Sequence, residues 1–349
     1  MKSTSAIILS FLTALLFLTC KSRPTNQTAT PVASEISVQF LDSLDASKAV
    51  VIDNTNDFFS RLTSLDMCIQ MKGDCKDDES RASILSRYKK YIQEDVTNFS
   101  DEEIQWLAGC WAEAVNLCNG LNKNILPPNV NLIKSKGTYY GGDAFYTRED
   151  CIVIPSERIE VRNYDAMLSV ILHEIFHLYS RANPVKQAAL YKIIGFESIG
   201  DSKDLIIDSP LKERILGNPD GPNFAYAIDL TSSTGPKKCI PIISSTLPKY
   251  VEAKGAFFDY LYFDLYEVKQ EANGKWKVIS DPTGNAAVPD DAMPSFFEQI
   301  KYNTQYIIHP DEVLADNFMI LALSKKDAEM LSNIDEAGKI LLGKIEEAL

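Results

Sequence analysis

The chain has 349 residues, of which 45% are hydrophobic and 24% are charged, and its 35 Lys and Arg against 48 Asp and Glu give a formal net charge of −13. This composition supports a globular core and excludes a wholly disordered chain, a collagen and a coiled coil. The length suggests about one to three domains. Because the chain is acidic and has no evident basic patch, we expect no binding to nucleic acid.

The N-terminus has the pattern of an export signal. Lys2 precedes an apolar run over residues 6–18, which is too short to span a bilayer but has the length of a signal-peptide core. The run stops just before Cys20, and this junction resembles the lipobox of bacterial lipoproteins. The resemblance implies a signal peptide at 1–19, a membrane anchor through a lipid on Cys20 with a tether to residue 35, and a periplasmic or surface location. Ordinary cleaved secretion and an uncleaved anchor are the alternatives.

Six cysteines follow Cys20, and their even number allows disulfides in an exported chain. Six cysteines permit 15 pairings, among which the sequence does not choose, and buried thiols are the alternative. There is no CxxC pair, which argues against a thiolate zinc ribbon and a thioredoxin-like redox site. The six are Cys68, Cys75, Cys110, Cys118, Cys151 and Cys239.

Residues 36–128 have mainly helical periodicity and are expected to form a helical N-terminal region. Apolar residues recur at helical spacing, beginning with Phe40, Leu41 and Leu44. A long helix is expected to begin after Ser100, which has capping-box spacing to Glu103.

After residue 128 the pattern changes to short strands and then to helices. An apolar helix is expected from 164 to 181, with Asn163 as its N-cap and Asn183-Pro184 at its end. Strands are expected at 130–133, 138–146 and 151–154, a hairpin at 257–269 and 275–279, and two final helices at 310–323 and from 326 onward. The fold class is therefore α+β, mostly helical, with a small mixed or antiparallel sheet packed on the apolar helix, and residues 129–349 form the domain that carries the chemistry.

Two of the only three histidines lie in that helix, in the sequence His173-Glu174-Ile175-Phe176-His177. Residues four apart share one helical face, so both imidazoles are able to bind one Zn²⁺, while Glu174 lies beside the water that completes the coordination. Glu174 then serves as general base and later as general acid. Two histidines paired with acids on an ordinary core helix are the alternative.

A catalytic zinc needs a third protein ligand. Asn183 stands where a metzincin has its third histidine, so we expect a carboxylate. Glu312 with Asp316 and Glu197 with Asp201 both have ExxxD spacing. Glu312 is favoured, because it falls in the first turn of a helix begun by Pro310, whereas Gly195 and Gly200 interrupt a helix around Glu197; another acid or water is the remaining alternative. Asp316 would then accept the other N–H of a ligand histidine.

Together, the HExxH sequence, Glu312 and Asp316 resemble the gluzincins, the thermolysin-like zinc metallopeptidases, over two helices. Residues 303–318 are also similar to a segment of uncharacterised bacterial HExxH proteins. The resemblance implies a zincin-like fold and a peptide or protein substrate held on an edge strand, for which 141–147 is the candidate and an ordinary core hairpin the alternative.

Gluzincins also use a Tyr or His donor to stabilise the oxyanion, and Tyr226, Tyr306 and His309 are the candidates here. We therefore expect zinc-dependent hydrolysis of peptide bonds. A surface-displayed binding lipoprotein with a structural or vestigial zinc site is the alternative, as is hydrolysis of a non-peptide amide.

Overall fold

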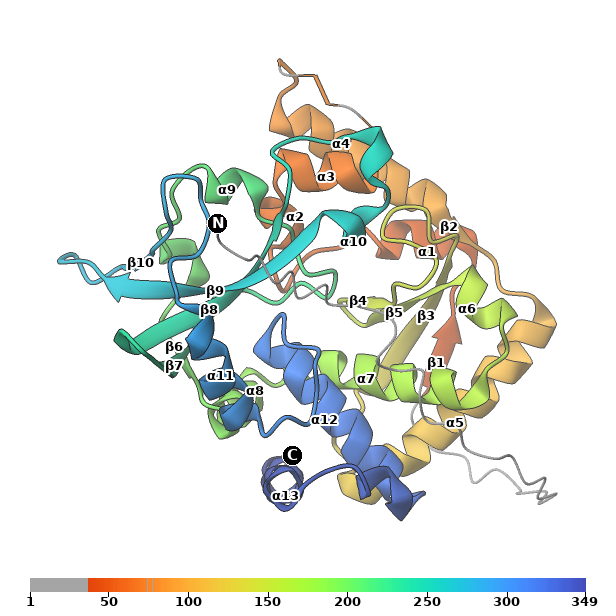
Figure 1. Ribbon diagram of the computed structural model, residues 1–349. Helices are drawn as coiled ribbons and strands as arrows, with labels where there is room; N and C mark the ends of the chain where they lie inside the picture. Colours follow the sequence, from red (N-terminus) through yellow and green to blue (C-terminus); the bar gives the residue numbers. More distant parts are fainter. Residues whose placement is uncertain (1–36, 74, 77) are drawn as a thin grey trace.

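The computed structural model describes residues 37–349 except 74 and 77, and runs of helices are interspersed with groups of strands along the chain (Figure 1). The predicted signal peptide, Cys20 and the tether lie outside the described residues. Within the described part of the chain, no helix has the length and apolar character needed to cross a membrane.

The helices differ widely in length, and the longest are α5 and α7. They are α1 (Ser43–Ala49), α2 (Phe58–Arg61), α3 (Ser64–Gln70), α4 (Arg81–Asp95), α5 (Asp101–Leu121), α6 (Ser156–Glu160), α7 (Tyr164–Ala182), α8 (Pro184–Ile193), α9 (Leu211–Arg214), α10 (Phe257–Tyr260), α11 (Met293–Ile300), α12 (Pro310–Ser324) and α13 (Glu336–Ala348). The strands are β1 (Ser37–Phe40), β2 (Val96–Thr97), β3 (Asn129–Ser135), β4 (Tyr146–Arg148), β5 (Cys151–Pro155), β6 (Phe196–Ser198), β7 (Tyr226–Ser232), β8 (Gly235–Ser245), β9 (Leu261–Gln270) and β10 (Trp276–Val278).

The first sheet is mixed and has the strand order β1-β3-β5-β4, with β2 added beside the end of β3. The pairs β1·β3 and β3·β5 are parallel, whereas β4 and β2 run antiparallel to their neighbours. Alternate residues of β5 face opposite sides. Ile152 and Ile154 join the core formed with α5, α7 and α12, and Cys151 and Val153 join the core formed with α2 to α4. The sheet therefore lies between two helical layers.

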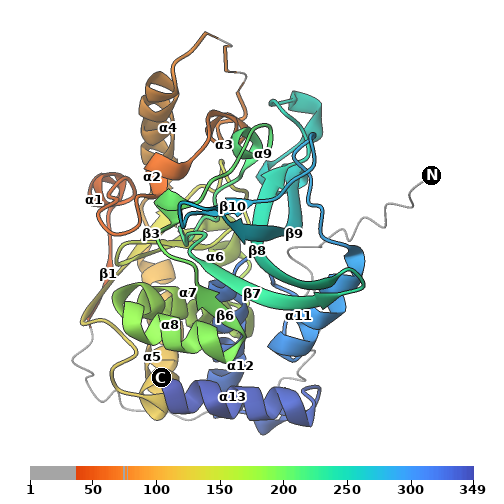
Figure 2. The ribbon, with the colours of Figure 1, turned by 90° about the vertical axis from the view of Figure 1, so that its left-hand side faces the viewer.

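The second sheet is antiparallel throughout, with the order β10-β9-β8-β7-β6. Apolar residues of β7 and β8 pack with α8 and α11 on one face, and a smaller cluster around Leu211 covers the other. In the view of Figure 2 this sheet lies beside the helical layer of α7, α8 and α12, and α13 packs against α8. The chain is thus a mixed α and β protein in which helices predominate.

Local signals in the sequence predicted several helix ends correctly. The side chain of Asn163 caps α7, and Pro184 begins α8 directly after α7 ends. Ser100 and Glu103 form the predicted capping box of α5. Pro310 occupies the first turn of α12. These features depend on residues within four positions of one another, which is why the sequence suffices to identify them.

Other expectations about elements were wrong. Phe40, expected in a helix, lies in β1, because β1 finds a parallel partner in β3 far along the chain. Only residues 146–148 of the expected strand 138–146 and its following turn pair with β5. Residues 257–260 form α10 before β9 begins, and the last helix begins at Glu336 rather than at Lys326, after a 3₁₀ turn over Ala328–Leu331.

The cysteines divide between a disulfide and buried thiols. Among the described residues Cys68 and Cys75 form a disulfide that joins the end of α3 to the following loop. The other four are unpaired and buried in the cores, namely Cys110, Cys118, Cys151 and Cys239. Burial raises the pKa of these thiols, so they are unreactive packing residues.

Candidate metal centre

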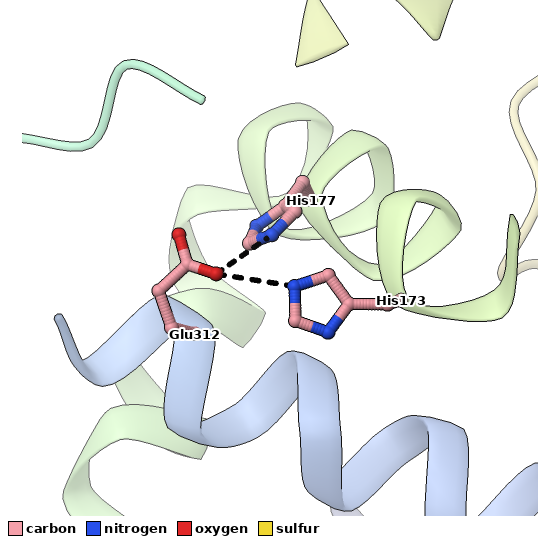
Figure 3. A group of neighbouring side chains, drawn as sticks. All are labelled: His173, His177 and Glu312. Carbon is pink, nitrogen blue, oxygen red and sulfur yellow. Dashed lines mark hydrogen bonds and ion pairs between the residues drawn. The ribbon is translucent and has the colours of Figure 1, made fainter. Parts of the chain in front are cut away.

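Two adjacent helices bring the predicted metal ligands together. His173 and His177 lie one turn apart on α7, and Glu312 lies in the first turn of α12, which packs against α7 (Figure 3). All three side chains are buried, with Glu312 fully so and His177 only 1% exposed. The favoured set of ligands therefore meets in space although 135 residues separate His177 from Glu312.

The distances between these three side chains suit one metal ion. Glu312 Oε2 lies 3.1 Å from His173 Nε2 and 3.3 Å from His177 Nε2. Four donors placed tetrahedrally about 2.0 Å from a zinc ion are about 3.3 Å apart, so these spacings match. In addition, His177 Nε2 is buried and has no hydrogen-bond partner within the described part of the chain. The cluster could therefore hold a metal ion between its three donors.

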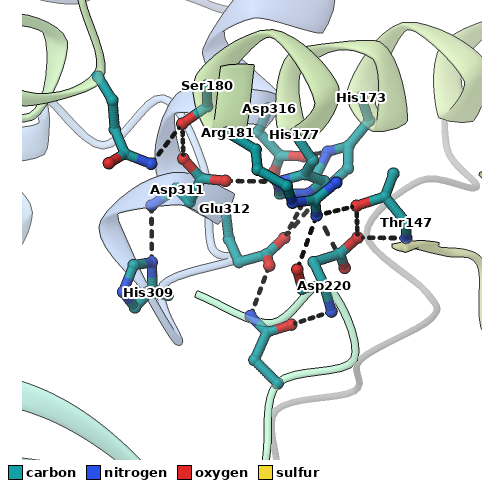
Figure 4. A network of polar contacts seen from close by, with 12 residues as sticks. Thr147, His173, His177, Ser180, Arg181, Asp220, His309, Asp311, Glu312 and Asp316 are labelled. Atoms are coloured by element: carbon teal, nitrogen blue, oxygen red, sulfur yellow. Dashed lines mark hydrogen bonds and ion pairs between the residues drawn. The ribbon is translucent and has the colours of Figure 1, made fainter. Parts of the chain in front are cut away.

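Each histidine is held by a carboxylate at its other ring nitrogen (Figure 4). His173 Nδ1 lies 3.0 Å from Asp316 Oδ1, as the sequence predicted, and His177 Nδ1 lies 2.7 Å from Asp311 Oδ2. When Nδ1–H donates to the carboxylate, the lone pair of Nε2 points toward Glu312. Loss of the Nε2 proton would therefore leave each imidazole in the tautomer that binds a metal through Nε2.

Asp311 was not among the site residues predicted from the sequence. Its Oδ1 accepts hydrogen bonds from Ser180 (2.5 Å) and Tyr191 (2.7 Å), and its backbone N–H donates to His309 Nδ1. The sequence does contain a pattern that indicates this residue. Two metal-binding histidines each need a partner for the second ring nitrogen, and two aspartates, Asp311 and Asp316, flank Glu312 on one helix.

The electrostatics of the cluster reflect many buried charges. Burial lowers the pKa of His173, but its hydrogen bonds to Asp316 and Glu312 outweigh this effect and raise it to about 10. Burial also lowers the pKa of His177, but the nearby carboxylates outweigh this effect and raise the pKa well above its usual value. The two histidines hold the pKa of Glu312 well below its usual value in spite of its burial. Positive charge beside the ionised Glu312 carboxylate is therefore energetically favourable.

Glu174 follows His173 on α7, and one of its oxygens lies within 4.8 Å of a ring nitrogen of His177. It is 3% exposed, and its Oε2 has no hydrogen-bond partner among the described residues. Burial, and after it the charge of Asp220, raises the pKa of Glu174 well above its usual value. One oxygen of Glu174, one of Asp220 and a nitrogen of His177 lie within 4.8 Å of one another. An unsatisfied buried carboxylate in this position is suited to accept a proton.

Asp220 lies in the loop of residues 217–223, whose Asn-Pro-Asp-Gly-Pro sequence is typical of a turn. In the structure this loop covers the cluster: Asn218 Nδ2 donates to Glu312 Oε1 at 2.6 Å, and Asp220 Oδ2 lies 4.0 Å from His177 Nε2. The Asn-Pro-Asp-Gly-Pro pattern identifies a turn but says nothing about its position, so the sequence did not reveal this part of the site.

The three candidate oxyanion donors lie at different places. The Tyr306 ring stacks on His173 with centroids 5.7 Å apart, and burial together with the charge of Glu312 raises its pKa. His309 is the N-cap of α12, and its Nε2 lies 2.9 Å from Asn223 O, so both its ring nitrogens are engaged. Tyr226 packs on Tyr191 rather than on a ligand histidine. Tyr306 is thus the candidate beside the cluster.

The alternative carboxylate pair lies elsewhere. Glu197 is exposed and belongs to β6, where it pairs with Ala227, and Asp201 caps a 3₁₀ turn after Gly200. The metal-competent groups of the described residues include neither. A strand in place of a helix removes the i,i+4 geometry on which this alternative depended.

β4 is one of the two edge strands of the first sheet and pairs antiparallel with β5. Of the candidate segment 141–147, only residues 146 and 147 belong to it. Its Thr147 N–H points away from β5 and donates to Asp220 Oδ1 at 2.7 Å. The outer edge at this residue is therefore already paired with the loop.

Comparison of the chain with protein-family models, with curated proteins and with solved structures gave no match.

Proposed function

We propose that this protein is an exported zinc metallopeptidase of the gluzincin type, anchored to the bacterial cell envelope through Cys20, and that it hydrolyses peptide bonds. The observation that carries the proposal is the buried His173, His177 and Glu312 cluster with an unsatisfied Glu174 carboxylate beside it. Two imidazoles, one carboxylate and an adjacent acid form the donor set of hydrolytic zinc sites. A zincin-like arrangement is supported by the antiparallel edge strand β4 and by the core that the first sheet shares with α7.

Each residue has a separate task in this proposal. His173, His177 and Glu312 would hold zinc, which when bound polarises the scissile carbonyl and lowers the pKa of a coordinated water. Asp316 and Asp311 fix the two imidazoles through their Nδ1 atoms.

Glu174 acts as base and then as acid. Its buried carboxylate takes the proton of the attacking water and returns it to the leaving amine, for which a raised pKa is favourable. Tyr306, stacked on His173, is the donor best placed to stabilise the oxyanion.

The test is Glu174→Gln, with Glu160→Gln as the control because Glu160 is exposed at the end of α6. We expect Glu174→Gln to keep its zinc, measured by elemental analysis, and to lose cleavage of a mixed-peptide library by a factor of at least about 10³. The control should retain both. Cleavage by the Glu174→Gln protein at the wild-type rate would refute the proposed role.

A structural zinc site in a binding lipoprotein is the second candidate. It is favoured by one observation, the Asp220 carboxylate close to His177 and Glu174, because a fourth protein donor is characteristic of structural zinc sites.

A further inference from the structure

The loop of residues 217–223, here called the covering loop, is held by its backbone. Three arginines from α2, β4 and α7 donate to four consecutive carbonyl oxygens. Arg148 donates to Pro219 O (2.9 Å), Arg181 to Asp220 O (2.8 Å), and Arg61 to Gly221 O (2.5 Å) and Pro222 O (2.7 Å). These hydrogen bonds involve only the backbone carbonyl groups of the loop. Any extended peptide with free carbonyl groups is therefore able to accept them in place of the loop.

The loop also occupies the edge of the sheet. Asp220 Oδ1 accepts from both the backbone N–H (2.7 Å) and the hydroxyl (2.8 Å) of Thr147 on β4. A peptide added to β4 as a further strand would need this same N–H. The covering loop therefore stands where an extended substrate would lie.

The two bonds to Oδ1 direct the second oxygen of Asp220 toward the metal centre. Oδ2 lies 4.0 Å from His177 Nε2, on the side where Glu174 Oε2 has no hydrogen-bond partner within the described residues. Asp220 is only 5% exposed, so solvent does not screen its charge. Among the described residues, His177 is the one cationic side chain that pairs with Oδ2, and a bound metal would take up the Nε2 atom of that histidine.

The loop is specified by its residues. Gly221 has φ +78°, and a Cβ atom there would lie 3.1 Å from Arg148 Nη1, so glycine is needed for the close approach to the arginine. Asn218 ties the loop to the site twice, since its Oδ1 accepts from the Asp220 N–H and its Nδ2 donates to Glu312. The position of the Asp220 carboxylate is thus fixed by its neighbours on both sides.

In the structure an Asp220 oxygen lies within 4.8 Å of His177 and Glu174, in a group that shares only His177 with the three donors His173, His177 and Glu312. We propose that Asp220 closes onto the metal as a fourth ligand when the ion binds, and that substrate displaces it together with the covering loop, so that the free protein is closed. The ligand role depends only on the metal centre, whereas the displacement by a peptide rests on the proposed peptidase function. An acidic side chain supplied by the chain itself would then keep water and peptide off the metal until a substrate takes over the contacts to β4 and the arginines.

The test is Asp220→Asn, which keeps the shape and the acceptor for Thr147 but removes the negative charge. The control is Asp229→Asn on β7, whose carboxylate is exposed and paired with Lys238. Zinc affinity is measured by chelator competition, and the cobalt-substituted proteins are titrated with acetohydroxamate while the visible spectrum is recorded. Peptide cleavage is measured in parallel.

We expect Asp220→Asn to bind zinc at least about tenfold more weakly, to show a changed cobalt spectrum without added ligand, and to bind acetohydroxamate at least about tenfold more tightly. Cleavage of peptides should increase several-fold, and the control should match wild type in all readouts. Thr147→Val, which removes one of the two bonds that anchor Asp220, should shift hydroxamate binding in the same direction by a smaller factor.

Other results separate the two parts of the inference. An unchanged zinc affinity and cobalt spectrum in Asp220→Asn would overturn the ligand role. A changed spectrum with loss of cleavage would overturn displacement by substrate, since Asp220 would then be required for the reaction. If neither wild type nor Asp220→Asn cleaves peptides while the metal readouts change as expected, the ligand role stands and the proposed peptidase function fails.

Discussion

Asp311, the hydrogen-bond partner of His177, offers the sharpest test of the candidate metal centre, because no role was predicted for it from the sequence. In Asp311→Asn, the side-chain oxygen is able to keep the bond to His177 Nδ1–H, and the new amide is able to donate to the hydroxyls of Ser180 and Tyr191 after these rotate. The shape of the site and the tautomer of His177 are then retained, but the charge that strengthens the imidazole as a ligand is lost.

The size of the effect follows from these contacts. His177 keeps the pKa of Asp311 below its usual value in spite of burial, so the native partner is a carboxylate at neutral pH. Loss of such a carboxylate behind a metal-ligating histidine weakens metal binding by about 10–100-fold, or about 1.4–2.7 kcal/mol. Replacement of one charged hydrogen bond by a neutral one should also cost about 1–2 kcal/mol of folding stability.

The assay is competition for zinc with a chelator of known affinity, combined with urea unfolding of the metal-free protein. The control is Asp165→Asn, since Asp165 also lies in the first turn of a helix, α7, but is exposed and should change stability by less than about 0.5 kcal/mol. If Asp311→Asn and the control bind zinc equally well, His177 does not bind metal in the way that we infer.

Two further predictions concern the ligand choice and pH. Glu312→Ala should lose stoichiometric zinc in elemental analysis while Glu197→Ala keeps it, and loss only in Glu197→Ala would reverse the assignment. Burial raises the pKa of Asp66 to about 7, above its value in the unfolded chain, so its contribution to stability is complete below about pH 4 and is lost as the pH rises through 7. In the wild type, the free energy of unfolding should therefore fall by about 4 kcal/mol between pH 4 and pH 8, and this fall should be absent in Asp66→Asn. The same dependence of the unfolding free energy on pH in both proteins would contradict the prediction.

The sequence predicted those parts of the site that depend on near neighbours in the chain. The spacing of His173 and His177 and the start of α12 at Pro310 follow from helical geometry and from capping, and both are found. The choice of Glu312 over Glu197 also came from local signals, because glycines around Glu197 do not suit a helix. Helix quality therefore ranked two carboxylates that spacing alone left equal.

The parts that sequence did not predict depend on contacts between distant segments. β1 pairs with β3, although about 90 residues separate them. The second sheet was expected only as one hairpin, and the covering loop reaches the metal centre through arginines of three different elements. A turn pattern fixes the conformation of a few residues and leaves their place in the fold undetermined.

The buried carboxylates and the two buried histidines of the cluster stabilise one another. Glu312 and the partners of His173 and His177 are carboxylates inside the core, where an isolated negative charge is costly. These carboxylates raise the pKa of both histidines, so positive charge is favoured in the space between them. A divalent cation held by the neutral imidazoles and Glu312 would supply positive charge at the same place. A metal ion and protons would therefore compete for this cluster, because the ligand nitrogens bind a metal only in their deprotonated form.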